Sequence, residues 1–163
     1  MASMRIDWLQ RVPIFGALSE DSVRFLLAQA REIEVAAGGY FFRENEPASA
    51  MYVLDSGRAV VLKGWHGAAI ELRRLDPGDC FGEMALLDLF PRSASIRALD
   101  DCSAIELTPA DLLQLFERDA AQFALIQMNI GRELCRRLRA TDELLFRARM
   151  GEAADTRALA CTT

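Results

Sequence analysis

The sequence predicts an α+β fold, mainly β, in which a β-rich middle lies between helical ends. An amphipathic helix is expected near the N-terminus, over residues 19–31. Residues 32–108 contain short β-rich runs about every ten residues, separated by Gly, Pro and Asp turn signals. From residue 109 the apolar residues return to helical spacing. Strands that recur in this way indicate a sandwich, a barrel or a roll.

The helical ends carry recognisable start signals. Ser19 is the expected N-cap, because acidic residues follow it in the first turn of the expected helix. Thr108 caps a second helix with Pro109 at its first position. A third helix begins near Asp119 and continues to Met150 without a proline. We expect residues 151–163 to form a flexible tail.

The third helix is long for a globular domain. A helix of roughly 30 residues spans about 45 Å, more than a domain of this size can cover. One stripe of the helix is largely apolar, with members three or four residues apart. The stripe consists of Ile126, Ile130, Leu134, Leu138, Thr141 and Leu145. We therefore expect a homodimer that is built along this stripe.

Composition predicts a single domain and argues against several classes of protein. Its 163 residues, 52% of them apolar, suffice for one substantial core. The net charge of −5 argues against a surface that coats nucleic acid or an anionic membrane. The N-terminal stretch has charges at Arg5, Asp7 and Arg11 and lacks the apolar region of a signal peptide. No apolar run reaches the roughly 18 residues of a membrane helix, so we expect a cytoplasmic protein.

Cysteine and histidine usage argues against a metal centre. Cys80, Cys102, Cys135 and Cys161 are widely spaced, without a C-x-x-C pair, and are expected to be reduced thiols. His66 is the only histidine and is expected at an exposed hairpin tip. A metal-dependent β-roll enzyme needs a histidine cluster, and a phosphodiesterase needs a metal cluster or a placed base. We therefore expect no metal and no catalytic residues.

The stretch "GDCFGEMALLDLFPRSASIRA", residues 78–98, places two opposite charges nine residues apart. Glu83 and Arg92 could pair with each other, or both could face a small ligand that carries hydroxyls and an anion. Arg92 offers a planar fork of donors suited to phosphate oxygens. Glu83, when ionised, only accepts and can take the proton of a hydroxyl. Backbone N–H groups from Gly82 to Ala85 can point at the anion from the start of a short helix.

The string "FGEMALLDLFPRSASIRA" in this context resembles the cyclic nucleotide-binding domain family, whose phosphate-binding cassette reads approximately F-G-E-x-A-L followed by P-R-small-A. The resemblance extends from about Phe15 to Met150. It implies an eight-stranded antiparallel, jelly-roll-like β-roll with N-terminal helices and two C-terminal helices, the last long and dimerising. The implied boundaries are 1–150 for the domain, 15–31 for the N-terminal helical region, 32–108 for the roll, 81–94 for the cassette and 109–150 for the C-terminal helices.

The resemblance also implies a ligand and the residues that hold it. The ligand is a cyclic nucleotide, cAMP in the first place, with cGMP as the alternative. Residues of the cassette line the sugar and hold the phosphate, and a threonine and an aspartate on the long helix face the base. The implied ligand-binding residues are Phe81, Gly82, Glu83, Met84, Ala85, Arg92, Ser93, Ala94, Thr141 and Asp142.

The implied function is that of a regulatory or sensor module that signals to a separate protein effector by rearranging its C-terminal helices. No helix-turn-helix follows the long helix. Its six arginines between residues 132 and 149 are expected to form a solvated face. We therefore expect no direct DNA binding. Two alternatives stay open: a degenerate roll that serves as a dimerisation or interaction scaffold or binds another ligand, and a β-roll enzyme.

Overall fold

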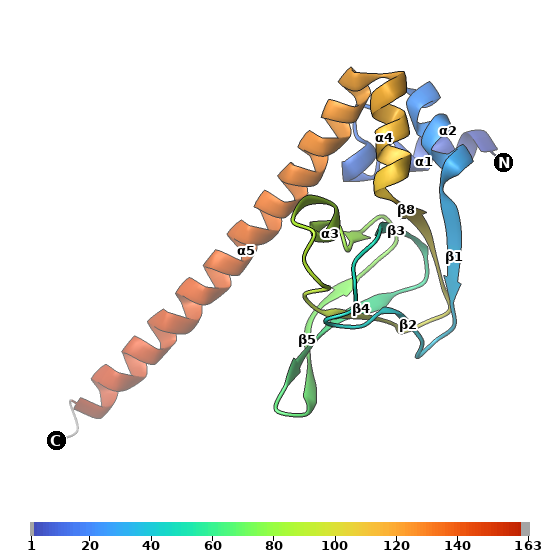
Figure 1. Cartoon of the computed structure of the whole chain (residues 1–163). Helices are drawn as coiled ribbons and strands as arrows, with labels where there is room; N and C mark the ends of the chain where they lie inside the picture. The colour runs from blue at the N-terminus through green and yellow to red at the C-terminus, as the bar shows by residue number, and fades with distance from the viewer. Residues whose placement is uncertain (1, 161–163) are drawn as a thin grey trace.

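The computed structural model describes residues 2–160, and the side chains of residues 6–84 and 86–151. The described chain forms eight strands and confirms the predicted antiparallel β-roll between helical ends (Figure 1). The strands are β1 Arg31–Val35, β2 Tyr40–Phe42, β3 Met51–Ser56, β4 Ala59–Trp65, β5 Ala68–Leu75, β6 Cys80–Phe81, β7 Ser95–Ala98 and β8 Cys102–Leu107. They pair in two four-stranded sheets of order β1-β8-β3-β6 and β2-β7-β4-β5.

Two of the helices begin directly after the predicted caps, Ser19 and Thr108. The helices are α1 Ala2–Leu9, α2 Glu20–Gln29, α3 Met84–Leu87, α4 Pro109–Arg118 and α5 Ala120–Ala160, with a 3₁₀ turn at Pro13–Phe15. The Ser19 hydroxyl accepts from Ser22 N at the start of α2. At the start of α4, Thr108 and Asp111 form a reciprocal capping box. The expected helix starts are therefore confirmed, whereas α1 was not anticipated.

Helix α5 is longer than the sequence predicted. It continues through residues 151–160, which were expected to be a flexible tail. These residues lack proline and are mostly good helix formers, and Gly151 alone costs only about 1 kcal/mol in a helix. The resulting 41 residues span about 60 Å, and the helix leaves the roll past α3 (Figure 1). No helix in the described part of the chain is both long and apolar enough to cross a membrane.

Two apolar cores hold the domain together. One lies between the two sheets and contains Tyr52 and Phe81, whose rings stack 5.3 Å apart. The other joins α1, α2, α4 and the first part of α5 to the sheet that contains β3 and β8. Burial of these two apolar layers fixes where α5 leaves the roll.

Part of the predicted dimer stripe belongs to the second core instead. Ile126 and Ile130 are 0% exposed within their own domain, and Leu134 packs against the same core. Leu138 and Leu145 are 60% and 53% exposed. The first half of the stripe is therefore used within the chain, because the domain itself covers that side of α5. Only the second half remains on the surface.

Candidate ligand-binding site

A cavity of about 280 Å³ lies between the roll, the cassette and α5. Enclosed sites for small organic ligands begin at about 300 Å³. Seven of the predicted site residues line the cavity: Phe81, Gly82, Glu83, Met84, Arg92, Ser93 and Ala94. The side chain of Ala85 lies outside the described residues. Thr141 and Asp142 are exposed on α5 and do not line the cavity of the single chain.

Arg92 is buried in the wall of the cavity. Its guanidinium carbon lies 3.9 Å from the centre of the Phe42 ring, a cation–π contact, and its Nη1 donates to the Gly82 carbonyl at 3.2 Å. Burial lowers the pKa of Arg92, because the charged form has lost its hydration. The buried Nε has no hydrogen-bond partner among the described residues. This desolvated cation is therefore suited to an anion in the cavity.

Gly82 allows Arg92 to lie against the cassette backbone. Its φ of +74° is in the left-handed region that favours glycine. A Cβ at this position would lie 2.6 Å from Arg92 Nη1 and 3.3 Å from the Ala50 carbonyl oxygen. Any side chain here would thus displace the guanidinium.

Glu83 pairs with a residue of α5. Its side chain is 1% exposed, and Oε1 accepts from Nη1 of Arg137. The second carboxylate oxygen, Oε2, is buried without a partner among the described residues. Of the two arrangements that the sequence left open, a direct ion pair of Glu83 with Arg92 is therefore not the one observed. The carboxylate links the cassette to the long helix instead.

Eight further residues line the cavity and were not predicted as site residues: Phe42, Val61, Arg73, Asp88, Phe90, Pro91, Ile96 and Arg137. Of these, Phe42, Arg73 and Arg137 come from β2, β5 and α5. Arg137 was expected on a solvated face, but it is only partly exposed because it reaches back to Glu83. Helical spacing could have identified Arg137, because it lies one turn before Thr141, the predicted base contact.

Three residues that line the cavity each have a buried polar atom without a partner among the described residues: Arg73 Nε, Arg92 Nε and Glu83 Oε2. Buried polar groups are nearly always hydrogen-bonded, so such atoms indicate a missing partner. The two nitrogens can only donate, and an ionised carboxylate can only accept. The wall is therefore complementary to a ligand that has anionic or carbonyl-type acceptors together with a hydroxyl donor.

Nothing in the described residues resembles a metal centre, since they contain no group of three or more His, Cys, Asp or Glu side chains that could hold an ion. His66 is exposed between β4 and β5, as expected, with a φ of +47°. Burial raises the pKa of the Cys80 thiol to about 12, so at neutral pH this cysteine is a protonated core residue.

Comparison with known proteins shows the family to which the chain is similar. The family described as "Cyclic nucleotide-binding domain" matches residues 32–119, more than half of the chain. The chain is 32% identical to the cyclic AMP receptor protein of Thermus thermophilus over 131 residues, which cover 80% of this chain and 59% of that protein. It is 36% identical to a cAMP-dependent protein kinase regulatory subunit of Emericella nidulans over 101 residues, 61% of this chain and 24% of that protein.

A solved structure shares the fold. It is a cyclic nucleotide-binding domain from Methylobacillus flagellatus KT, with a TM-score of 0.79 over 88% of this chain and 84% of that one, at 21% identity. The chain spans only part of the two curated relatives, about three fifths of one and a quarter of the other. The matched residues include all of the cassette and the eight strands apart from the first residue of β1. The chain belongs to the cyclic nucleotide-binding domain family.

Proposed function

We propose that this chain is a regulatory module that binds cAMP and carries the signal through α5. The observation that supports the proposal is that three residues lining one cavity each have a buried, unpartnered polar atom: Arg73 Nε, Arg92 Nε and Glu83 Oε2. A cyclic nucleotide has an anionic phosphodiester, a free ribose 2′-hydroxyl and a base with ring acceptors. Two of the relatives described above are named for cAMP.

Each part of the ligand has a matching group in the cavity. Arg92 and the Ser93 hydroxyl bind the phosphate, and the Ala94 N–H adds a neutral donor. Glu83 Oε2 accepts the hydrogen bond of the 2′-hydroxyl. Phe81, Gly82 and Met84 form the floor on which the sugar and phosphate lie. Arg73 Nε remains for an acceptor of the base.

The ion pair between Glu83 and Arg137 is the proposed route from ligand to signal. It joins the cassette to α5 across 54 residues of sequence. When the 2′-hydroxyl donates to Glu83 Oε2, it competes for the carboxylate and shifts the position of the group that holds Arg137. From Arg137 the helix continues for about 35 Å to Ala160, so a small rotation is amplified at its far end (Figure 1).

Calorimetric titration of cAMP into the purified chain tests the proposal. We expect saturable binding with one ligand per chain. The absence of saturable heat at millimolar cAMP would contradict the assignment and favour the alternative of a degenerate roll that serves as a scaffold.

Base selectivity is expected to come in part from α5. Thr141 can accept from the adenine amine, and Asp142 can accept there but repels the guanine carbonyl. Both side chains are exposed, so they would reach a base only from a partner copy or after α5 moves. An unsatisfied hydrogen bond costs about 1 to 3 kcal/mol, which corresponds to a preference for cAMP over cGMP of roughly 5-fold to 150-fold.

Competition titrations with both nucleotides measure this preference. Thr141→Ala and Asp142→Ala should each reduce it. Equal wild-type affinities, or a preference that survives both substitutions, would show that the helix does not select the base.

A homodimer is proposed along the surface half of α5. Apolar or small residues there are spaced as in a coiled coil: Met128, Gly131, Cys135 and Leu138 are three, four and three residues apart, and Leu145 follows seven residues later. All of them are exposed except Gly131, which is partly exposed, and the charged Asp142 occupies the repeat position between Leu138 and Leu145. Packing this face against a second copy would remove it from water.

Sedimentation at tens of micromolar should therefore report twice the chain mass. Leu138→Asp should shift the protein to a monomer, because it places a charge in the middle of the seam. Leu113→Asp is the matched control, since Leu113 is similarly exposed on α4, away from the seam. A monomeric wild type, with or without cAMP, would contradict the dimer.

A further inference from the structure

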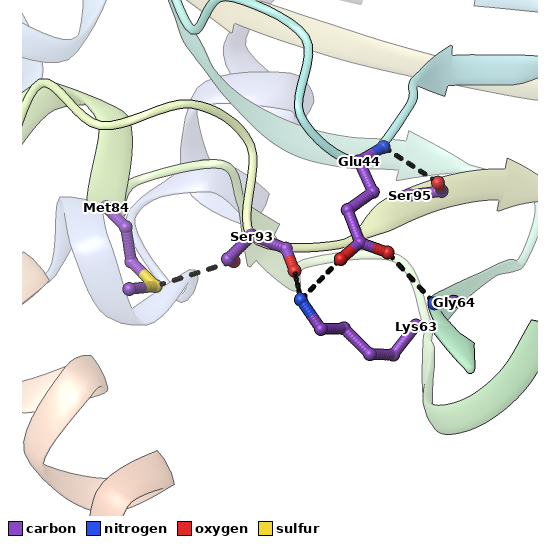
Figure 2. Close-up of polar contacts among 6 residues, drawn as sticks. All are labelled: Glu44, Lys63, Gly64, Met84, Ser93 and Ser95. Carbon is purple, nitrogen blue, oxygen red and sulfur yellow. Dashed lines mark hydrogen bonds and ion pairs between the residues drawn. The ribbon is translucent and has the colours of Figure 1, made fainter. Parts of the chain in front are cut away.

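Glu44, Lys63 and the Ser93 carbonyl form a polar clamp (Figure 2). Lys63 Nζ donates to Glu44 Oε1 at 2.5 Å and to Ser93 O at 2.7 Å. Glu44 Oε2 accepts from Gly64 N at 2.9 Å. Neither Glu44 nor Lys63 lines the cavity. The clamp therefore ties β4 to the last part of the cassette at Ser93, a cavity residue, while its two charged side chains stay outside the lining.

The backbone of the neighbouring cassette residue, Arg92, is held differently, by hydrogen bonds to backbone groups. Asn45 N donates to Arg92 O at 2.8 Å, and Arg92 N donates to Glu46 O at 2.9 Å. The turn can do this because Asn45 adopts a φ of +69°, a conformation that asparagine tolerates. These bonds fix the backbone of Arg92 but not the next peptide unit. That unit is the one whose carbonyl Lys63 holds.

The orientation of that peptide unit determines where a donor points. A trans peptide is planar, so the Ser93 carbonyl and the Ala94 N–H point in opposite directions. The carbonyl is directed at Lys63, outside the cavity, whereas Ala94 itself is buried and lines the cavity. The Ala94 N–H is therefore turned away from the clamp.

We propose that Lys63, anchored by Glu44, is a positioning residue that orients the Ser93–Ala94 peptide so that the Ala94 N–H donates to the ligand's phosphate. This role rests on the proposed binding of a cyclic nucleotide. Glu44 is needed because a free lysine side chain would lose conformational entropy on holding one carbonyl. Its N–H also donates to the Ser95 hydroxyl at 2.8 Å, which fixes Glu44 to β7 (Figure 2).

The charge state of the anchor suits this role. The hydrogen bond from Lys63 and that from Gly64 N lower the pKa of the Glu44 carboxyl. Glu44 is therefore ionised at neutral pH, and its contribution to the clamp is lost only when the pH falls through the lowered value.

The competing explanation is that Lys63 attracts the phosphate only through its charge. For one substitution, this explanation predicts a change in cAMP affinity of the opposite sign. If Lys63 acted only through its charge, Glu44→Gln would remove a nearby negative charge and tighten binding. If Lys63 acts through the clamp, Glu44→Gln loosens it and weakens binding. The sign of the change in cAMP affinity separates the two.

Calorimetric titration of cAMP into wild type, Lys63→Met, Glu44→Gln and the double variant is the experiment. We expect each single variant to bind about 10-fold more weakly, since one hydrogen bond to an anion is lost or misaligned. The double variant should be no weaker than either single one, because the clamp acts as a unit. Lys63→Arg keeps several donors, so its affinity for cAMP should stay within about 3-fold of the wild-type value.

Two phosphorothioate analogues of cAMP supply a readout that a general loss of stability would not move. In each, sulfur, a weak acceptor, replaces one of the two exocyclic phosphate oxygens. The wild type should distinguish them, because the Ala94 N–H faces only one oxygen. Lys63→Met should bring the ratio of their dissociation constants closer to one.

The matched control is Arg58→Met. Arg58 directly precedes β4, forms an exposed ion pair with Asp100 at 2.7 Å and does not line the cavity. Its removal changes the net charge as Lys63→Met does, and cAMP affinity should stay unchanged.

Three results would overturn the clamp while cAMP binding by the wild type is retained: Lys63→Met with wild-type affinity, Glu44→Gln with tighter binding, or an unaltered phosphorothioate ratio in Lys63→Met. A wild type that binds no cAMP would instead overturn the proposed function, and the clamp's role with it.

Discussion

Replacing Arg92 with leucine is expected to nearly abolish cAMP binding without destabilising the fold. The phosphate would enter the cavity without its counter-charge. Losing a buried charge-assisted partner costs on the order of 2 to 5 kcal/mol, or about 30-fold to several thousand-fold in affinity. Calorimetric titration of cAMP into wild type and Arg92→Leu measures this loss.

The thermal stability of Arg92→Leu, unlike its cAMP affinity, should not fall. Arg92 is 5% exposed, its pKa is lowered by burial and its Nε lacks a partner among the described residues. Replacing such a desolvated cation with an apolar side chain is often neutral or stabilising. The melting temperature of Arg92→Leu should therefore equal or exceed that of wild type.

Arg74→Leu provides the control for this substitution. Arg74 is exposed on β5 and pairs with Glu71 at 2.9 Å, so its removal costs the same charge without touching the cavity. It should bind cAMP as wild type does. An Arg92→Leu protein with wild-type affinity would contradict the role of the cassette.

Glu83→Gln is expected to weaken cAMP binding by about 10-fold to 150-fold. Oε2 is the buried acceptor assigned to the 2′-hydroxyl, and a hydrogen bond to a charged group contributes about 1.5 to 3 kcal/mol. The substitution also removes the ion pair with Arg137. A mutant cycle with 2′-deoxy-cAMP separates these two effects.

In that cycle, wild type should lose affinity for the 2′-deoxy ligand, whereas Glu83→Gln should bind both ligands about equally. Arg137→Met is the comparison, because it breaks the ion pair but keeps Oε2. It should still prefer cAMP to the 2′-deoxy ligand. Full discrimination by Glu83→Gln would show that this carboxylate does not contact the hydroxyl.

The features predicted correctly are those that depend on neighbours in the chain. The caps at Ser19 and Thr108 depend on residues three positions away. The strands follow from short apolar runs between turn residues. The cassette brings seven of its predicted residues to one cavity because they lie within 14 consecutive positions around α3.

The features missed depend on contacts between distant segments. Arg137 looked like one of six arginines on a polar helix face until the fold brought it to Glu83. Ile126 and Ile130 fitted a dimer stripe equally well, because helical spacing identifies an apolar side but not what covers it. The clamp of Lys63 and Glu44 joins β4 to the turn after β2.

By itself, the sequence determined the α+β class, the order of the strands and of the helices from α2 onward, and the cassette with Glu83 and Arg92, since each depends on local spacing and residue chemistry. Only the tertiary structure decided how those charges are partnered. Arg92 stacks on Phe42 and Glu83 meets Arg137, so both are buried with unused hydrogen-bonding atoms. The physical reason is that burial and pairing arise from the packing of α5 and two sheets around one cavity, and no local pattern encodes that packing.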